Sequence, residues 1–252
     1  MNPQEGGVPI EVQCEVVSVD CLNHDVRRVL LRAPVQRPSL WYAGQYLIVR
    51  RVKGGTAFSI ANAPGGRDIE LHIRYDRENG SLGEAIALLE GSTKVTIELP
   101  CGRRYIDTPP DRPLWFLCNS TGFAPMKAML EHLRNVGFAG EVRLYWGARR
   151  RADLYLEDAA HELQRQMRNL RYTAVVSEEA TQHRAPTLVH DAAMVELHAP
   201  GEPLFFVGGS PSMAWSAFDS LVARGVPPDN IHSDVYDYAP RSPAAAHGGA
   251  PR

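Results

Sequence analysis

The sequence lacks three features that would have assigned it to a class at once: a charge excess, a long apolar run and a paired set of cysteines. Its 252 residues carry 27 basic and 29 acidic side chains, a net charge of −2, which argues against a general nucleic-acid or membrane-surface binder. No apolar run reaches the roughly 18–20 residues of a membrane span, and the first residues lack the pattern of a signal peptide. These absences predict a cytoplasmic protein.

The four cysteines form neither a C-x-x-C pair nor a ferredoxin-type run; they are Cys14, Cys21, Cys101 and Cys118. Their spacing gives no support for a zinc site or an iron–sulfur cluster. The nine histidines show no H-x-x-x-H spacing. We therefore predict that the chain binds no metal.

The pattern that is present changes along the chain. From Ile10 to about Leu99, short runs rich in valine, isoleucine and aromatic residues are interrupted by glycine, proline and asparagine. These runs predict a small six-stranded antiparallel barrel, with strands at residues 11–19, 26–33, 46–52, 57–62, 69–75 and 94–99. One short helix is expected near Gly83 to Leu89.

After Asp111 the sequence indicates alternating strands and helices. Strands are expected at 114–118, 142–146, 170–176, 204–207 and 231–236. Helices are expected around 126–133, at 156–167, from a cap at Thr187 to Leu197, and at 212–223. This alternation predicts a doubly wound parallel sheet. We expect a barrel domain at residues 1–110, an α/β domain at 111–238, and a disordered tail at 239–252.

Two turns rich in small residues follow strands of the second half. The first is Asn119 to Gly122, before a helix whose N-terminus favours an anion such as pyrophosphate. The second is Gly208 to Met213, where paired glycines allow close approach to the backbone. Neither turn matches G-x-G-x-x-G or G-x-S-x-G. Taken alone, each also fits an ordinary connection from strand to helix, just as Phe58 fits a barrel core as well as a cofactor platform.

The order and spacing of several motifs together resemble the ferredoxin–NADP reductase superfamily, in its flavin reductase and oxygenase-reductase branch. The motifs are YAGQYLIV (42–49), AFSIANAP (57–64), LHIRYD (71–76), STGFAP (120–125), YWGARRRADLY (145–155) and GGSPSM (208–213). The resemblance covers roughly Val12 to Tyr238. It implies a flavin-binding barrel followed by a nicotinamide dinucleotide domain, in an oxidoreductase that passes hydride from NADH to FAD.

The resemblance also implies roles for individual residues. Phe58 would flank the isoalloxazine ring, and the Ser59 hydroxyl, the expected catalytic group, would lie near flavin N5. The other flavin contacts that it implies are Thr56, His72, Ile73, Arg74, Ser81, Leu82, Gly83, and either Tyr236 or Tyr238 over the second ring face. The dinucleotide contacts that it implies are Ser120, Thr121, Gly122, Arg149, Glu178, Gly208, Gly209, Ser210, Pro211 and Met213.

Departures from the family pattern change the expected affinities. Thr56 stands in place of the flavin-motif arginine, Asn119 and Ser120 in place of paired glycines, and Gly208 in place of a cysteine. FAD, still expected in preference to FMN, is therefore expected to bind loosely, as a substrate, or to be lost. The alternative is a non-catalytic binding or regulatory module that keeps the fold with degenerate motifs.

Coenzyme choice and electron acceptor follow from two further observations. Glu178 stands where NADP-dependent relatives tend to place an arginine, and a carboxylate repels the 2′-phosphate, so NADH is the expected donor. The run Arg149 to Arg151 argues the other way, since an arginine loop that reached the phosphate would favour NADPH. Because the chain has no cluster-binding cysteines, electrons are expected to leave to a separate acceptor: an oxygenase component, a ferredoxin or free flavin.

Overall fold

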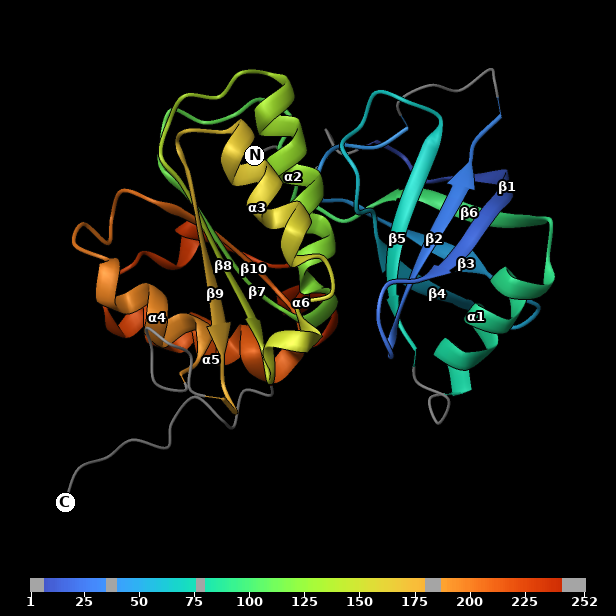
Figure 1. Ribbon diagram of the computed structural model, residues 1–252. Helices are drawn as coiled ribbons and strands as arrows, with labels where there is room; N and C mark the ends of the chain where they lie inside the picture. The colour runs from blue at the N-terminus through green and yellow to red at the C-terminus, as the bar shows by residue number, and fades with distance from the viewer. Residues whose placement is uncertain (1–6, 35–39, 76–79, 180–186, 242–252) are drawn as a thin grey trace.

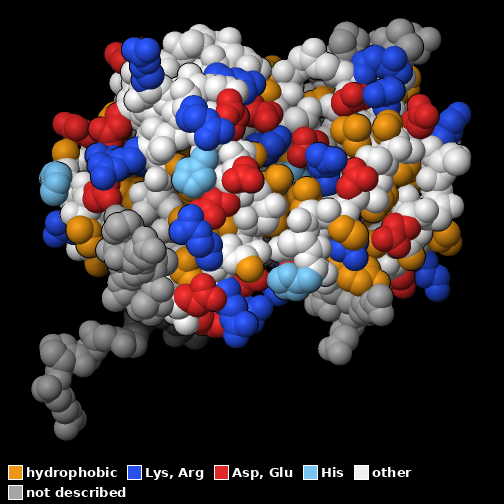
Figure 2. Space-filling model, viewed as in Figure 1, with side chains coloured by type: hydrophobic (Ala, Val, Ile, Leu, Met, Phe, Trp, Pro, Cys, Tyr) orange, Lys and Arg blue, Asp and Glu red, His pale blue; other side chains and the backbone are white. Residues whose placement is uncertain are grey.

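The computed structural model describes residues 7–34, 40–75, 80–179 and 187–241, and within these ranges the chain builds two sheets. Figure 1 shows an antiparallel sheet with one helix beside a parallel sheet that carries helices on both faces. The fold class predicted from the sequence is confirmed. On the face shown in Figure 2, acidic and basic side chains are interspersed, as the small net charge suggests.

The first sheet has the strand order β4-β3-β6-β1-β2-β5, and all its neighbours are antiparallel. Its strands are β1 (Ile10–Cys21), β2 (Val26–Arg32), β3 (Tyr46–Arg50), β4 (Gly55–Ser59), β5 (Asp68–Arg74) and β6 (Lys94–Cys101). An antiparallel bridge between Ile60 and Leu71 joins the two edges, and the Ala61 N–H donates to the Glu70 carbonyl at 2.7 Å. We call these contacts, between residues 60–62 and 68–71, the seam; they close the sheet into a barrel.

Side-chain alternation in the strands gives the barrel its core. Leu47 and Val49 on β3 point inward because residues two apart share a face, and both are fully buried. Helix α1 (Gly80–Gly91) adds Ala85, Ile86 and Leu89 to the same core. The helix begins three residues before the predicted start at Gly83, and residues 76–79, including the last residue of the LHIRYD motif, lie outside the described ranges.

The second sheet has the strand order β11-β10-β7-β8-β9, with all neighbours parallel. Its strands are β7 (Leu114–Asn119), β8 (Val142–Ala148), β9 (Leu170–Val176), β10 (Leu204–Gly208) and β11 (Ile231–His232). Helices α2 (Phe123–Asn135) and α3 (Glu157–Gln166) cover one face, and α4 (Val189–Glu196) and α5 (Pro211–Ala223) cover the other (Figure 1). Successive residues Phe116 and Leu117 accordingly belong to two different apolar clusters.

Two element predictions in this half are wrong. The last strand ends at His232 rather than Tyr236, because the chain turns where the Val235 N–H meets the Ser233 hydroxyl at 3.2 Å and then forms helix α6 (Val235–Tyr238). Helix α4 starts at Val189 with Leu188 at the cap position, so Thr187 does not cap it.

The carboxyl end of the described chain packs against α5. Residues 239–241 belong to the segment predicted to be disordered, yet Arg241 pairs with Asp219 and its guanidinium lies 4.4 Å from the Trp215 ring centroid. Residues 242–252, the rest of that prediction, lie outside the described ranges. The predicted domain boundary at 110–111 falls in the connection between Cys101 and Leu114. In the described ranges no helix is long and apolar enough to cross a membrane.

Candidate functional site

A cavity of about 750 Å³ lies beyond the carboxyl ends of the parallel strands, where the second half faces the barrel. The second half lines it with the turns after β7 and β10, the ends of β8 and β9, and the segment after β11. The barrel lines it with Ser59, Arg74, the β1–β2 turn residue Asp25 and the first residue of β2, Val26. Ligands of open parallel sheets bind at this edge. The cavity is therefore a candidate binding site that both halves build.

The two small-residue turns touch each other through their backbones. A Cβ atom added to Gly122 would lie 2.4 Å from the carbonyl carbon and oxygen of Gly208. Gly209 has a φ of +140°, and a Cβ there would lie 1.9 Å from the Asn119 Oδ1 atom. That same oxygen accepts a hydrogen bond from the Ser210 N–H at 3.2 Å. Asn119, a departure from the family pattern, thus bridges the turns, and glycine is required where they meet.

Neighbouring side chains fix the shape of each turn. Ser120 adopts a φ of +47°, and its carbonyl accepts a hydrogen bond from the Trp146 ring N–H at 3.1 Å. The Trp146 ring stacks on Phe123, the first residue of α2, with centroids 3.9 Å apart. The Ser210 hydroxyl caps α5 by accepting from the Met213 N–H at 3.3 Å. Both turns therefore open helices whose first N–H groups favour an anion.

On the barrel side, β4 is tied to the start of α1. The Thr56 hydroxyl donates to the Ser81 carbonyl at 3.2 Å. Arg51, at the end of β3, pairs with Glu84 in the same helix, and its side chain is only 13% exposed. A guanidinium therefore lies close to the position from which the family arginine is missing, and sequence reasoning overlooked it. The only sequence signal was its place just before the hairpin that leads into β4.

Comparison with known proteins decides the family. Residues 116–218 match the oxidoreductase NAD-binding domain. The NAD(P)H-flavin reductase of Vibrio harveyi is 30% identical over 174 residues, covering 66% of this chain and 73% of that protein. The chain belongs to the ferredoxin–NADP reductase superfamily. The resemblance stated from the motifs is confirmed, and with it the assignment of the chain as an oxidoreductase.

Two further relatives are named as reductases of a dioxygenase and of a cytochrome P450. Reductase component 1 of terephthalate 1,2-dioxygenase from Comamonas sp is 30% identical over 222 residues, covering 86% of this chain and 65% of that protein. The crystal structure of the Amycolatopsis cytochrome P450 reductase GcoB superposes with a TM-score of 0.80 at 25% identity, covering 89% of this chain and 69% of that chain. The chain spans about two thirds of the length of both relatives.

A superfamily member is expected to hold FAD, and the barrel residues fit that group. Ser59 and Arg74 reach the cavity wall from β4 and β5. The Thr56–Ser81 contact holds β4 against the first turn of α1, where Ser81, Leu82 and Gly83 lie. Arg51 adds a cation there. The donor set therefore suits a flavin that carries phosphate, which Arg51 and the first turn of α1 would hold.

The structure brings about half of the predicted site residues of this superfamily member into the cavity wall. They are Ser59, Arg74, Ser120, Thr121, Gly122, Arg149, Gly208, Gly209, Ser210, Met213 and Tyr238. Those outside the wall are Thr56, Phe58, His72, Ile73, Ser81, Leu82, Gly83, Glu178, Pro211 and Tyr236. Phe58 and Ile73 pack in the barrel core, and Tyr236 donates its hydroxyl hydrogen to the Ala214 carbonyl at 3.1 Å. Their cofactor contacts stay predictions.

The end of β9 carries the groups that bear on coenzyme choice in this superfamily. Ser177 lines the cavity, and its N–H donates to the Ala148 carbonyl at 3.1 Å. Glu178 is exposed; its N–H donates to the Arg149 carbonyl, and its carboxylate lies 3.9 Å from the Arg150 guanidinium. A carboxylate and two arginines thus converge at one corner of the site.

Sequence reasoning missed several polar residues of the cavity wall, among them His190, Ser216 and Asp234. His190 is buried, and its Nε2 atom lies 3.3 Å from the Ser216 hydroxyl. Burial raises the pKa of Asp234 to about 6, although a backbone hydrogen bond from Arg103 opposes the rise. No motif marks these positions, because only the packing of α4, α5 and α6 at one sheet edge brings them together.

Proposed function

We propose that the chain is an NADH-dependent flavin reductase that passes electrons to a separate acceptor. The observation that carries this proposal is the shared cavity: the Ser120–Gly122 turn and Ser59 lie in the walls of one space. A nicotinamide held by the turns would therefore face a ring held by the barrel, within a site that limits access of water. The flavin, when bound, supplies the hydride-accepting chemistry.

The chain's own residues bind and orient. We infer that the two turns hold the dinucleotide through backbone N–H groups at the starts of α2 and α5. Ser59 would present a hydroxyl toward the flavin ring, and the exposed Tyr238, which also lines the cavity, would contact the other ring face. FAD is the proposed flavin in preference to FMN, because the barrel motifs resemble the flavin motif of this superfamily, and Arg51 beside the first turn of α1 supplies groups suited to phosphate.

The acceptor is proposed to be a separate protein or free flavin. The relative from Comamonas is named as one component of a dioxygenase system. Among the described residues, no three His, Cys, Asp or Glu side chains lie together as a metal site would need. We therefore propose an oxygenase component or a ferredoxin as the partner, and free flavin as the other acceptor class.

The test is the visible spectrum of the purified protein with and without added FAD, followed by anaerobic addition of NADH. We expect bound flavin to absorb near its usual ~450 nm band and NADH to bleach that band. Ser59→Ala should bind FAD as the unmodified protein does but bleach more slowly, since only the group near N5 is removed. Failure to bind or reduce either flavin would instead support the non-catalytic module, for which the missing motif arginine at Thr56 is the supporting observation.

We expect NADH to be preferred to NADPH by about tenfold in kcat/KM, or about 1.4 kcal/mol. A carboxylate about 5 Å from a 2′-phosphate costs roughly 3 kcal/mol at an effective dielectric near 20, and exposure of Glu178 reduces that cost. Glu178→Arg should narrow the ratio. Glu90→Arg, the same charge change on the exposed barrel helix α1, is the control and should leave the ratio unchanged. A preference of the unmodified protein for NADPH would show that Arg149 and Arg150 dominate.

We expect kcat/KM for NADH to decrease as pH falls through about 6, where Asp234 gains its proton. Above that pH the partly buried carboxylate is ionised and favours the positive charge that nicotinamide acquires on losing hydride; below it that interaction is lost. Asp234→Asn should have a lower kcat/KM at pH 7 and no step near pH 6. A step of the same size in Asp234→Asn would assign the ionisation to another group.

A further inference from the structure

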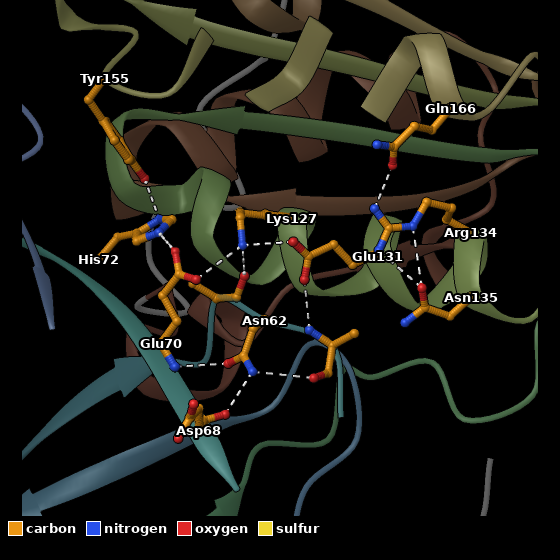
Figure 3. Close-up of polar contacts among 12 residues, drawn as sticks. Asn62, Asp68, Glu70, His72, Lys127, Glu131, Arg134, Asn135, Tyr155 and Gln166 are labelled. Carbon is orange, nitrogen blue, oxygen red and sulfur yellow. Dashed lines mark hydrogen bonds and ion pairs between the residues drawn. The ribbon is translucent and has the colours of Figure 1, made fainter. Parts of the chain in front are cut away.

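A chain of buried and partly buried polar side chains crosses the interface between the barrel and the parallel-sheet half (Figure 3). We call it the interface network; its members are Glu70 and His72 on β5, Lys127 and Glu131 on α2, and Tyr155 before α3. His72 is 5% and Lys127 8% exposed. Burying an ion pair is costly unless its geometry satisfies both partners. Such a network is therefore weak evidence for stability, and its role is better sought in how it positions the two halves of the chain.

Lys127 is the centre of the interface network. Its ammonium group donates to the Ala61 carbonyl at 3.0 Å and lies 3.4 Å from Glu70 Oε2, both on the barrel. It also lies 2.8 Å from Glu131 Oε1, one turn further along its own helix. The second Glu131 oxygen accepts from the Ala63 N–H of the barrel at 3.0 Å. One cation therefore joins α2 to the barrel directly and, through Glu131, a second time.

His72 extends the interface network to Tyr155. Burial lowers the pKa of His72, and the hydrogen bond with Glu70 offsets this only in part, so the imidazole is neutral near pH 7. Burial acts to raise the pKa of Glu70, but the His72 hydrogen bond and the Lys127 charge outweigh it, so the carboxylate persists. A carboxylate only accepts, hence His72 Nε2–H donates to Glu70 at 2.7 Å. Nδ1 then accepts from the Tyr155 hydroxyl at 3.0 Å.

The members of the interface network adjoin both walls of the cavity. On the barrel, Ala61 follows Ser59 by two residues, and His72 precedes Arg74 by two. In the other half, Lys127 lies one turn into the helix that begins directly after the Ser120–Gly122 turn. The Tyr155 ring meets Trp146 edge-on at 5.2 Å between centroids, and Trp146 holds the Ser120 carbonyl. Displacement of the network therefore moves one wall relative to the other.

We propose that Lys127 is a positioning residue for hydride transfer, which holds the dinucleotide turn at a fixed distance from the flavin-side strands. This proposal rests on the proposed function. Reacting atoms must approach to about 3–3.5 Å, and a displacement of about 1 Å costs on the order of 10²-fold in rate. Lys127 itself does not line the cavity, so its effect on the rate passes through the walls that it holds.

The experiment compares the unmodified chain with Lys127→Met, which leaves Glu70 and Glu131 facing each other without a cation. We expect the rate of flavin reduction at saturating NADH to fall about 10- to 100-fold, with little change in the Kd for NADH because both turns remain. Amide hydrogen exchange, measured without cofactors, should become faster at residues 61–63 and 70–72. The double variant with Glu70→Gln should be no slower than Lys127→Met alone, since the two residues act as a pair.

The matched control is Arg134→Gln on the same helix. Arg134 donates to Gln166 at 2.6 Å and so joins α2 to α3 within one half rather than across the interface (Figure 3). This variant should leave the reduction rate and the exchange at residues 61–63 unchanged. If Lys127→Met does not fold, the isosteric Glu131→Gln, which weakens the second link, is measured in its place.

Four outcomes decide between the explanations. A reduced rate at saturating NADH together with faster exchange supports the positioning role. An unchanged reduction rate with faster exchange would show that Lys127 only stabilises the interface. Unchanged exchange would show that Lys127 does not hold the interface. Each of these two results overturns the proposal. An unmodified protein that reduces no flavin overturns the proposed function, and the exchange result separates this case because it requires neither cofactor.

Discussion

Replacing Gly122 by alanine is expected to lower kcat/KM for NADH about a hundredfold, or about 2.7 kcal/mol. The new Cβ would lie 2.4 Å from the Gly208 carbonyl group and 2.6 Å from the Gly209 nitrogen. These are backbone atoms, so the two turns have to separate for the methyl group to fit. Steady-state kinetics with NADH, in the presence of saturating FAD, measures the effect.

The loss in Gly122→Ala should not be explained by unfolding. Overpacking of this kind costs typically 1–3 kcal/mol of stability, which a thermal melt detects separately. Gly201→Ala in the same half is the control, because its Cβ meets no atom within 4 Å. It should keep both the melting temperature and the kinetics of the unmodified chain. Unchanged NADH kinetics in Gly122→Ala would show that the dinucleotide does not use the contact between the turns.

Restoring the arginine of the flavin motif, Thr56→Arg, is expected to tighten FAD binding by about ten- to a hundredfold. A charge-assisted hydrogen bond to phosphate contributes roughly 1.5–3 kcal/mol, which corresponds to that range of affinity. The change removes the Thr56–Ser81 hydrogen bond, one neutral contact at an exposed position. Titration of the apo-protein with FAD, followed by flavin fluorescence, measures the Kd.

Thr56→Lys is the companion variant for this test. It supplies the charge without the planar fork of arginine, so it should gain less affinity if the phosphate is held by two parallel hydrogen bonds. An affinity for FAD that stays flat or falls in Thr56→Arg would indicate that Arg51 already fills this role, or that the pyrophosphate lies elsewhere. Arg51→Gln distinguishes the two, because only in the first case does it weaken binding.

Much of the fold was predictable because its signals are local. The apolar run Leu170–Val176 is β9 at the predicted residues, and the change from alternating runs to strand–helix alternation marks the two halves. Predictions from local signals failed where contacts with distant segments make the chain turn. The sequence predicts residues 233–236 as the end of the last strand, whereas the turn at Ser233 and packing against α5 lead into a helix at Val235–Tyr238.

The candidate site was predictable to the extent that motifs mark it. Turns such as Ser120–Gly122 carry a glycine signal, and they line the cavity. No motif marks Asp234 or Arg51, because each gains its setting from segments distant in sequence. Lys127 is the clearest case: its position on α2 suggests a solvated residue, yet the barrel buries it. A pattern within one element does not reveal which other element will cover it.

The barrel seam has a consequence for how far the two halves are independent modules. Ala61 closes the seam through its N–H and binds Lys127 through its carbonyl, and Glu70 does the same through its own carbonyl and its carboxylate. The strand ends that complete the barrel are thus the surface on which α2 rests. Recombination between relatives at the connection near residue 110 would therefore place the barrel seam of one protein against helix α2 of another. Such chimeras should keep the interface network only when the new helix carries a lysine and a glutamate at the positions of Lys127 and Glu131.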